Sequence, residues 1–355
     1  MINNNVRTID YKPLVTGVIS FIIALAISFV LTSGIVILAG FKPLEVFWYS
    51  LSGGFGSLQR LGLTMNEAAP LLFCTLGLIV AFRAGIWNIG AEGQLYIGAV
   101  GATITGLYIT GLSKIPHLII VAIASIIFGA LFGALPGYLK TRFNANEIIT
   151  SLLLNFVAIW FVGYLVRFPM VDPGAYIPVS DKIQESARLP LIFKENPAHI
   201  GIIIAIVCAV LVWFLYERTL LGYRFKAIGS NINTALFGGI NVKVLIVLSM
   251  AISGGLAGLA GMSQVSGVHF VLSGYLSPAQ YGFFAIPIVF IARLNPFGAI
   301  ITCIFFGGLL TGAKFVQLTL GIDPTVISIF LALIMLTLML GPFLEKRLKK
   351  IMFKS

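Results

Sequence analysis

Ten long apolar runs limit what this chain can fold into. They fall at about residues 14–39, 65–82, 86–110, 115–139, 147–166, 199–216, 244–262, 281–293, 297–319 and 324–344. A helix needs about 20 mostly apolar residues to cross a hydrocarbon core about 30 Å thick. The runs are continuous, whereas a membrane barrel needs strands of alternating polarity, so helices are the fold that satisfies the backbone in lipid. The sequence therefore predicts an all-α polytopic membrane protein with about ten transmembrane helices.

Composition supports this prediction. Hydrophobic residues make up 59% of the 355 residues and charged residues only 10%, whereas a soluble domain has about 25% charged residues. Ten spans leave little chain for a soluble domain, so we expect a single transmembrane domain over residues 1–355. The first apolar run is too long for the core of a signal peptide and is predicted to be the first membrane helix.

The basic residues predict the orientation in the membrane. With ten spans and a cytoplasmic N-terminus, fifteen of the 23 Lys and Arg residues fall on the cytoplasmic side, as the positive-inside rule requires. We therefore expect a plasma-membrane protein with both termini in the cytoplasm. The net charge of +11 is explained by topology, so it does not indicate nucleic-acid binding.

Three connecting segments are long enough to have structure of their own. Residues 167–198 are proline-rich and are predicted to lie outside the cell, and residues 217–243 are basic and predicted to lie in the cytoplasm. Residues 263–282 carry no charge other than a histidine and are rich in small residues. This pattern is typical of a re-entrant or broken segment, which membranes tolerate only where protein or a water-filled cavity covers it.

Several kinds of site are missing from the sequence. There is no GxxxxGK[ST] loop to hold a nucleotide, no nucleophile beside a base and no pair of carboxylates suited to hydrolysis. Three scattered cysteines, Cys74, Cys208 and Cys303, lie inside apolar runs and have no metal-binding spacing. We expect no catalytic residues, no metal and no cofactor on this chain. An intramembrane enzyme is therefore disfavoured, and any uphill transport needs an ion gradient or another subunit.

The stretch GIWNIGAEGQLYIGA, residues 85–99, places polar side chains where the chain should cross the membrane. On a continuous helix, one ridge contains residues spaced by four, which would allow close packing of a neighbouring helix: Gly90, Gln94, Gly98, Ala102 and Gly106. Asn88, Glu92 and Tyr96 would form a polar stripe on roughly the opposite side. A charge at mid-membrane costs at least about 2.5–3.5 kcal/mol, so Glu92 should face protein or water. Two interpretations stay open, hydrogen bonding between helices and direct contact of Glu92 or Gln94 with a substrate.

A second polar stripe follows in NANEIITSLLLNFVA, where Glu147, Ser151 and Asn155 are spaced by four. Asn144 or Asn146 could cap the start of this helix, with Glu147 favourable in its first turn. Asn155 lies deeper and is a candidate for a polar contact between helices. Together with Asn88, Glu92 and Gln94, Asn155 is a candidate residue of a substrate pathway.

Two other patterns have simpler explanations. SGGLAGLAG, residues 253–261, places small residues on adjacent ridges and predicts close helix packing. Lys314, Gln317 and Asp323 lie near the outer end of the last two helices, where a solvated rim or contact with an external partner would explain them.

The basic loop 217–243 is the more informative clue to function. It opens with basic residues and continues with a short helix-like stretch between Gly229 and Gly239. A short helix across the inner mouth of a transporter could contact a motor subunit. A loop attracted to anionic lipid would have the same composition.

The sequence of this loop, GYRFKAIGSNINTALFGGI, resembles the coupling-helix segment of the permeases of branched-chain amino acid and ribose importers of the ATP-binding cassette (ABC) class. APLLFCTLGLIVAFRAGIWNIGAEGQLYIGA and NANEIITSLLLNFVA are similar to the nucleoside branch, whose members work with a BmpA-type lipoprotein. The resemblance covers most of residues 60–340. Trp87 departs from the smaller or phenylalanine-like residue that the family pattern suggests.

The resemblance implies an ABC importer permease fold and three partners. A second permease chain, commonly a related but different one, would line the pathway together with this chain. A cytoplasmic ATPase would use ATP and Mg, and an extracytoplasmic lipoprotein would deliver nucleoside. The matching positions Gly229, Asn231, Ala235 and Gly239 would belong to the coupling segment, and we expect substitution of Arg224 or Gly229 to uncouple ATP hydrolysis from transport without preventing membrane insertion.

Two alternatives to a nucleoside importer remain. Within the same class, the substrate could be ribose, another simple sugar or a branched-chain amino acid. In a different class, the chain could be a secondary transporter, with Glu92 or Glu147 as a proton or ion site. Gradient-driven uptake by the isolated chain would favour the second alternative.

Overall fold

The computed structural model describes residues 12–277 and 280–352, and all regular structure within them is helical apart from two isolated β-bridges. Arg7 and Lys354, two of the basic residues used to predict orientation, lie outside this range. The α-helices are α1 Lys12–Leu38, α2 Pro43–Phe55, α3 Leu58–Arg83, α4 Ala91–Tyr108, α5 Lys114–Phe143, α6 Glu147–Leu165, α7 Gly201–Arg218, α8 Leu220–Ser230, α9 Ile232–Phe237, α10 Val242–Gln264, α11 Tyr281–Ile291, α12 Pro296–Leu320, α13 Pro324–Met339 and α14 Gly341–Met352. A 3₁₀ turn, η1, covers Glu185–Ala187, and a π-helical segment, η2, covers Val265–His269.

The structure does not confirm the expected number of membrane spans. Seven helices among the described residues are long and apolar enough to cross a membrane, or eight if Ile22–Leu38 and Pro43–Phe55 together form one broken span. Every predicted apolar run contains a helix, but α11 has only 11 residues and α4 interrupts its apolar residues with glycines, Glu92 and Gln94. The chain is thus a multi-pass helical membrane protein, while the expected count of about ten is not confirmed.

The chain forms two compact units. The larger comprises Ser50–Phe315 and holds α3 to α11 with parts of α2 and α12. The smaller comprises the described parts of Met1–Tyr49 and Val316–Ser355. In it, α1 packs against α13 and α14, and the ring of Phe47 contacts those of Phe29 and Phe330, at centroid distances of 4.5 and 5.1 Å.

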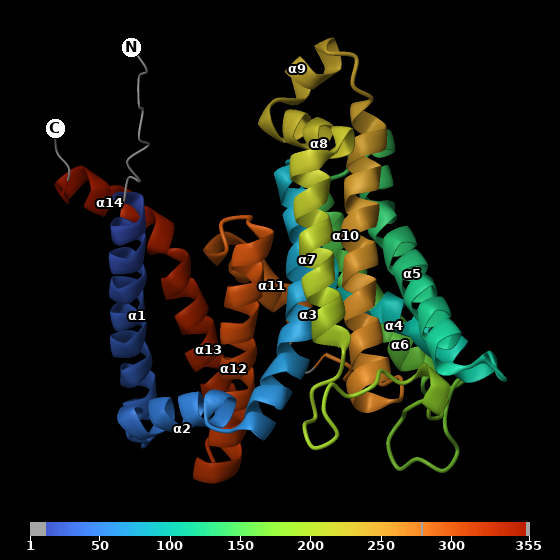
Figure 1. Ribbon diagram of the computed structural model, residues 1–355, viewed down its shortest axis with the longest axis horizontal. Helices are drawn as coiled ribbons and strands as arrows, with labels where there is room; N and C mark the ends of the chain where they lie inside the picture. Colours follow the sequence, from blue (N-terminus) through green and yellow to red (C-terminus); the bar gives the residue numbers. More distant parts are fainter. Residues whose placement is uncertain (1–11, 278–279, 353–355) are drawn as a thin grey trace, which may run out of the picture. The chain divides into compact units, whose positions relative to one another are not determined.

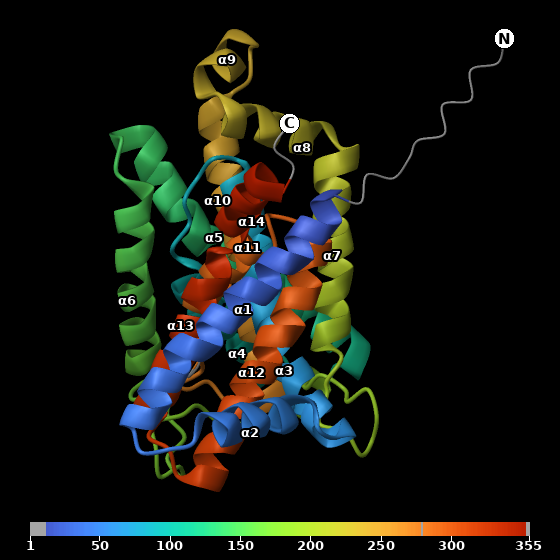
Figure 2. The same ribbon diagram turned by 90° about the vertical axis from the view of Figure 1, so that its left-hand side faces the viewer.

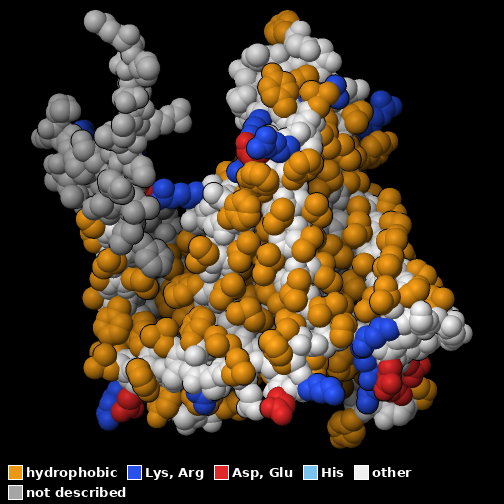
Figure 3. All heavy atoms as spheres, viewed as in Figure 1, with side chains coloured by type: hydrophobic (Ala, Val, Ile, Leu, Met, Phe, Trp, Pro, Cys, Tyr) orange, Lys and Arg blue, Asp and Glu red, His pale blue; other side chains and the backbone are white. Residues whose placement is uncertain are grey.

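In the larger unit, α3 and α4 lie at the centre. Nearly all of α3 from Ala68 to Ala81 is buried, whereas α5, α6 and α7 expose large apolar side chains such as Leu131, Leu153 and Leu211. Figure 3 shows apolar side chains over much of the visible face of the larger unit, with charged groups gathered towards its two ends. This distribution is typical of helices whose outer faces contact lipid.

Glycines bring the backbones of α4, α5 and α10 into direct contact. A Cβ atom on Gly98 of α4 would collide with the backbone of Gly258 on α10, and one on Gly254 would collide with the carbonyl oxygen of Gly129 on α5. Small residues at helix contacts permit this close approach in membranes. The close packing predicted for residues 253–261 is confirmed.

The helix connection predicted to be broken is broken. Helix α10 ends at Gln264, continues as η2 and gives way to irregular chain before α11 begins at Tyr281. Phe270, directly after η2, and Gln280, directly before α11, both have a left-handed backbone, with φ of 60° and 54°. A non-glycine residue seldom adopts this conformation, so both ends of the irregular segment are sharply defined turns.

Helices α8 and α9 lie at one end of the larger unit, and the connection between α6 and α7 lies at the opposite end (Figures 1 and 2). The second connection contains the predicted loop 167–198, whose only helical element is η1. The segment between Gly229 and Gly239 contains the short helix α9, as its sequence indicated.

Candidate functional site

Asn88 and Gln94 form a reciprocal pair of buried amides. The Nδ2 of Asn88 donates to Oε1 of Gln94 at 3.0 Å, and Nε2 of Gln94 donates to Oδ1 of Asn88 at 3.1 Å. Asn88 Nδ2 also donates to Oγ of Ser253 on α10, at 2.8 Å. The prediction that Asn88 and Gln94 lie on opposite faces of one helix is wrong. Helix α4 begins only at Ala91, so Asn88 belongs to the preceding turn and can fold back onto Gln94.

The same turn is held from the other side by α6. The backbone N–H of Gly93 donates to Oδ1 of Asn155 at 2.8 Å, and Nδ2 of Asn155 donates to the carbonyl of Ile89 at 2.8 Å. The N–H of Ile89 donates to Oγ of Ser151 at 3.0 Å. We call Asn88, Gln94, Ser151, Asn155 and Ser253 the amide cluster. The predicted polar contact of Asn155 across helices is confirmed, and each member of the cluster is at most 1% exposed.

The start of α6 settles which asparagine caps it. Oδ1 of Asn146 accepts the N–H of Ile148 at 2.9 Å, whereas Asn144 ends α5 in a left-handed conformation with φ of 55°. Glu147 pairs with Lys140 of α5. Asn146 is therefore the cap, and Glu147 links two helices.

Glu92 and Tyr96 hold the irregular segment that follows η2. The N–H of Gly282, in the first turn of α11, donates to Oε2 of Glu92 at 2.7 Å. The hydroxyl of Tyr96 donates to the carbonyl of Gly274 at 3.2 Å and accepts the N–H of Ser277 at 3.4 Å. Of the two interpretations offered for Glu92, the structure displays the hydrogen bond between helices.

A second acid was missed by the sequence analysis. The hydroxyl of Tyr281 donates to Oε2 of Glu67 at 2.8 Å, and Nζ of Lys314 lies 2.6 Å from Oε1 of the same carboxylate. Glu67 is an acidic residue within the second apolar run, which is the signal that could have identified it. Lys314 was expected at a solvated rim; its side chain is 54% exposed and ion-paired.

Four buried polar atoms near η2 lack a hydrogen-bond partner among the described residues. They are Nε2 of Gln264, Oγ of Ser266, Nε2 of His199 and Nε of Arg188. Burial lowers the pKa of His199 to about 4, so its ring is neutral at pH 7, and Nδ1 accepts the N–H of Gly201 at 3.0 Å. Unpaired buried groups are uncommon, and π-helical turns are often functional. This segment therefore differs from the amide cluster, whose polar side chains are hydrogen-bonded.

Of the five residues expected in the coupling loop, Arg224 and Gly229 lie in α8, Ala235 lies in α9, and Asn231 and Gly239 lie directly beside α9. Arg224 is exposed on α8, and a Cβ on Gly229 would collide with the carbonyl oxygen of Arg83 at the end of α3. Asn231 caps α9, with its Oδ1 accepting the N–H groups of Asn233 and Thr234 at 2.9 and 3.1 Å. Ala235 is buried, and Gly239 ends the turn with a left-handed φ of 74°.

Helix α9 exposes apolar side chains at its end of the larger unit. Phe237 is 93% exposed, Leu236 55% and Ile232 42%. At the position of α9, beyond the ends of the long helices (Figure 1), this apolar surface is suited to contact with a protein partner. The structure thus brings Asn88, Gln94 and Asn155 together around residues 88–94, whereas Glu92 binds α11. The five candidate coupling residues lie in α8, in α9 or directly beside them. No group of three or more His, Cys, Asp or Glu in the described ranges is placed to hold a metal ion.

Comparison with known proteins gives a family. Residues 61–340 match the model of the branched-chain amino acid transport system / permease component family. The guanosine ABC transporter permease protein NupP of Bacillus subtilis is 31% identical over 91% of this chain and 92% of its own length.

Two other relatives are named for other substrates. The nucleoside ABC transporter permease protein NupB of Lactococcus lactis is 25% identical over 93% of this chain and 92% of its own length. The glucose ABC transporter permease protein TsgB13 of Haloferax volcanii is 29% identical over 81% and 78%. No solved structure matches the chain. The family match spans the amide cluster, the broken segment and the α8–α9 pair, and the chain belongs to the permease family of ABC transporters.

Proposed function

We propose that this chain is one permease subunit of an ATP-driven nucleoside importer. The observation that carries the proposal is the similarity to the guanosine permease NupP, which extends over about nine-tenths of both chains. The second nucleoside relative has a similar coverage. Glucose is the alternative substrate, because a glucose permease is also similar, over a smaller share of the chain.

Energy would enter through α8 and α9. In this proposal a cytoplasmic ATPase, using ATP and Mg, docks against α9, and Ile232, Leu236 and Phe237 supply the apolar contact. Their exposure supports a protein partner over a lipid surface, since α9 itself carries no basic residue. Arg224 on α8, together with Gly229, Asn231, Ala235 and Gly239, would give this coupling segment its charge and shape.

The proposed orientation follows from the same assignment. With α8 and α9 in the cytoplasm, the connection between α6 and α7 lies outside, at the opposite end of the larger unit (Figure 1). An extracytoplasmic substrate-binding lipoprotein would dock there. Both termini would then be cytoplasmic, and a second permease chain would complete the pathway.

We further propose that Asn88, Glu92, Gln94 and Asn155 build the wall of the substrate pathway. All four are buried, and their polar atoms hydrogen-bond to other parts of the chain. The role of a wall fits this burial, because Asn88, Glu92 and Asn155 accept backbone N–H groups and Gln94 holds the Asn88 side chain in place.

Reconstitution tests the function directly. The complex of this chain with its ATPase, second permease and binding protein would be placed in liposomes, and uptake of labelled guanosine and labelled glucose would be measured with and without ATP. We expect ATP-dependent guanosine uptake that unlabelled nucleosides compete for and glucose does not. Equal guanosine uptake without ATP would contradict the proposal, and uptake of glucose alone would replace the substrate.

A further inference from the structure

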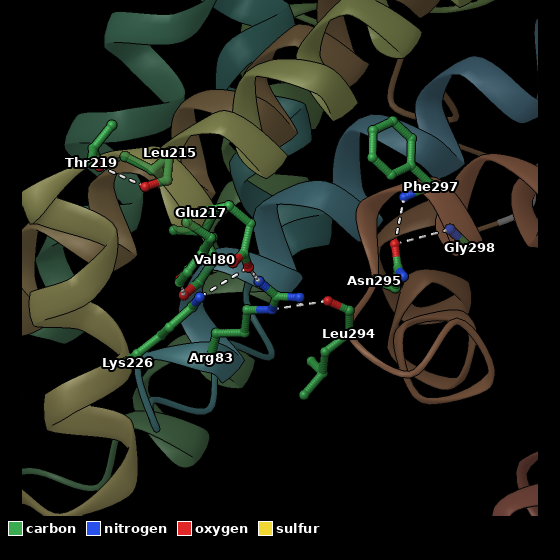
Figure 4. Close-up of polar contacts among 11 residues, drawn as sticks. Val80, Arg83, Leu215, Glu217, Thr219, Lys226, Leu294, Asn295, Phe297 and Gly298 are labelled. Atoms are coloured by element: carbon green, nitrogen blue, oxygen red, sulfur yellow. Dashed lines mark hydrogen bonds and ion pairs between the residues drawn. The ribbon is translucent and has the colours of Figure 1, made fainter. Parts of the chain in front are cut away.

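The C-terminal end of α3 is a meeting point for two other parts of the larger unit. Nη1 of Arg83 lies 3.7 Å from Oε1 of Glu217 at the end of α7, and Nε donates to the carbonyl of Leu294 at 3.0 Å (Figure 4). The guanidinium also lies over the ring of Tyr216, 4.8 Å from its centroid. One side chain therefore joins α3 to the α7–α8 corner and to the turn between α11 and α12.

Helix α8 is tied to this point in two ways. Nζ of Lys226 lies 2.9 Å from the same Oε1 of Glu217. Gly229 packs so closely on the Arg83 carbonyl that a Cβ would collide with it, and a Cβ on Gly85 would lie 3.1 Å from Cα of Gly229. The backbone of α8 thus rests directly on the turn that follows α3. We call Arg83, Glu217, Lys226 and the carbonyl of Leu294 the Arg83 network.

The turn on the other side of Arg83 has an unusual backbone. Arg293 and Leu294 are consecutive non-glycine residues with left-handed φ of 54° and 56°. Such residues are strained and persist only when their surroundings hold them. The hydrogen bond from Arg83 is one restraint, and the N–H of Leu294, which donates to the carbonyl of Val289 at 3.0 Å, is another. Next to this turn, Oδ1 of Asn295 accepts the N–H of Phe297 at 2.9 Å (Figure 4).

Aromatic rings fix the end of α11 to the same region. The rings of Phe82, Trp87 and Phe290 lie within 5.1 to 5.9 Å of one another by their centroids. The ring of Trp87 bridges the turn after α3 and the last turn of α11.

The other end of α11 is clamped as well. Tyr281 binds Glu67 on α3, and Gly282 binds Glu92 on α4. Glu67 and Arg83 are separated by 16 helical residues, or about 24 Å at 1.5 Å per residue. Helix α11 therefore runs beside α3 from the irregular segment that follows η2 to the Arg83 network, and it is held at both ends.

We propose that Arg83 is a positioning residue that passes movement of α8 and α9 to α11 and so to the irregular segment at its far end. The inference rests on the proposed function, in which an ATPase moves α8 and α9. A guanidinium suits this role because its planar fork can serve the Glu217 carboxylate and the Leu294 carbonyl together, which an ammonium group cannot do in the same geometry.

The first test measures ATP hydrolysed per guanosine imported by the reconstituted complex. We expect Arg83→Gln to raise this ratio about fivefold or more, the range of an ordinary coupling free energy, while the complex still assembles and hydrolyses ATP. Arg83→Lys should have an intermediate ratio because it keeps the charge but not the fork. Arg142→Gln, which removes an exposed arginine at the end of α5, is the matched control and should leave the ratio unchanged.

The second test follows the connection itself. Spin labels at Tyr223→Cys on α8 and Ile301→Cys on α12 occupy exposed positions, and the native cysteines are buried. In the otherwise unchanged protein we expect the same label separation without nucleotide and with ADP–vanadate, because the turn that Arg83 binds leads directly into α12, so that α8 and the start of α12 move together in this proposal. Adding Arg83→Gln should make the separation depend on nucleotide, which a purely stabilising role of Arg83 would not cause.

The outcomes separate the two proposals. If Arg83→Gln imports guanosine with ATP and keeps the coupling ratio and label separation of the unaltered protein, the proposed role of Arg83 is overturned and the proposed function is not. Absence of ATP-driven uptake by the unaltered complex overturns the proposed function. If Arg83→Gln does not assemble, Glu217→Gln decides: a raised ratio supports the connection, and an unchanged ratio overturns it.

Discussion

The amide cluster and the Arg83 network are both polar, but they differ in charge and in exposure. The cluster consists of uncharged side chains that are at most 1% exposed. Three of them accept hydrogen bonds from backbone N–H groups within residues 89–93. The network is charged, and its side chains are 22% exposed at Arg83, 42% at Glu217 and 44% at Lys226. Buried amides can hold a chain turn permanently, whereas partly hydrated ion pairs can rearrange at small cost. This difference supports a structural role for the amide cluster and the proposed role of the Arg83 network in passing on movement of α8 and α9.

The largest effect is expected from Asn155→Leu in the amide cluster. The substitution leaves the N–H of Gly93 and the carbonyl of Ile89 without their partner, and each unpaired buried group costs about 1–3 kcal/mol. Thermal unfolding in detergent should show a clearly lowered midpoint and a poor yield of monodisperse protein. Leu153→Ala, at a 58% exposed site on the same helix, should behave like the unaltered protein. Equal midpoints for the two variants would contradict a supporting role for the cluster.

Glu92→Leu should have the next largest effect. It removes the acceptor of the Gly282 N–H, a single buried backbone group, so about 1–3 kcal/mol of stability should be lost. Glu92→Gln keeps an acceptor oxygen and should lose less. The measurement is the thermal midpoint of all three proteins in one detergent, and a Gln variant as unstable as the Leu variant would show that the charge, not the hydrogen bond, matters.

Gly229→Ala should still insert and assemble, with a moderately lowered thermal midpoint, while raising the ATP hydrolysed per guanosine imported. The added methyl group collides with the Arg83 carbonyl, so α8 must shift away from the turn after α3. Gly163→Ala is the control, since its Cβ would meet only the end of Arg167, at 3.9 Å. Normal coupling in Gly229→Ala would remove α8 from its proposed role.

The smallest effect is expected from Lys314→Gln. Its ion pair with Glu67 is short, but the lysine side chain is 54% exposed, and exposed pairs contribute about 0–1 kcal/mol. Tyr281 still donates to Glu67 in this variant, so uptake and the thermal midpoint should both stay close to those of the unaltered protein. A loss as large as that of Asn155→Leu would mean that Lys314 belongs with the buried supports.

The helices, the break after residue 262 and the short helix before Gly239 could be predicted because apolar runs and glycines determine the local backbone structure from neighbouring residues. It could not predict that α4 starts at Ala91, because the preceding turn is fixed by partners 62 and 165 residues away, Ser151 and Ser253. The same limit explains why Asn88 was placed on the wrong face. Glu67 and Arg83 were passed over for a related reason: their partners, Tyr281, Lys314, Glu217 and Leu294, are distant in the sequence.

The expected number of spans depended on two apolar runs that form α4 and α11. Glycines, Glu92 and Gln94 lower the hydropathy of α4, and α11 is short, so neither meets the criteria for a full span. Both helices are central to the site, where α4 packs against α10 and α5, and α11 packs against α3 and α4.

The energy source is the most direct test of the account. Labelled guanosine uptake should be measured in liposomes that contain either this chain alone or the full complex, under a proton gradient, a sodium gradient, or ATP without a gradient, each with the unaltered sequence and with Glu92→Gln. We predict no uptake by the isolated chain under either gradient, and ATP-driven uptake by the complex that Glu92→Gln preserves. Gradient-driven uptake by the isolated chain that Glu92→Gln abolishes would contradict the account and make Glu92 an ion site.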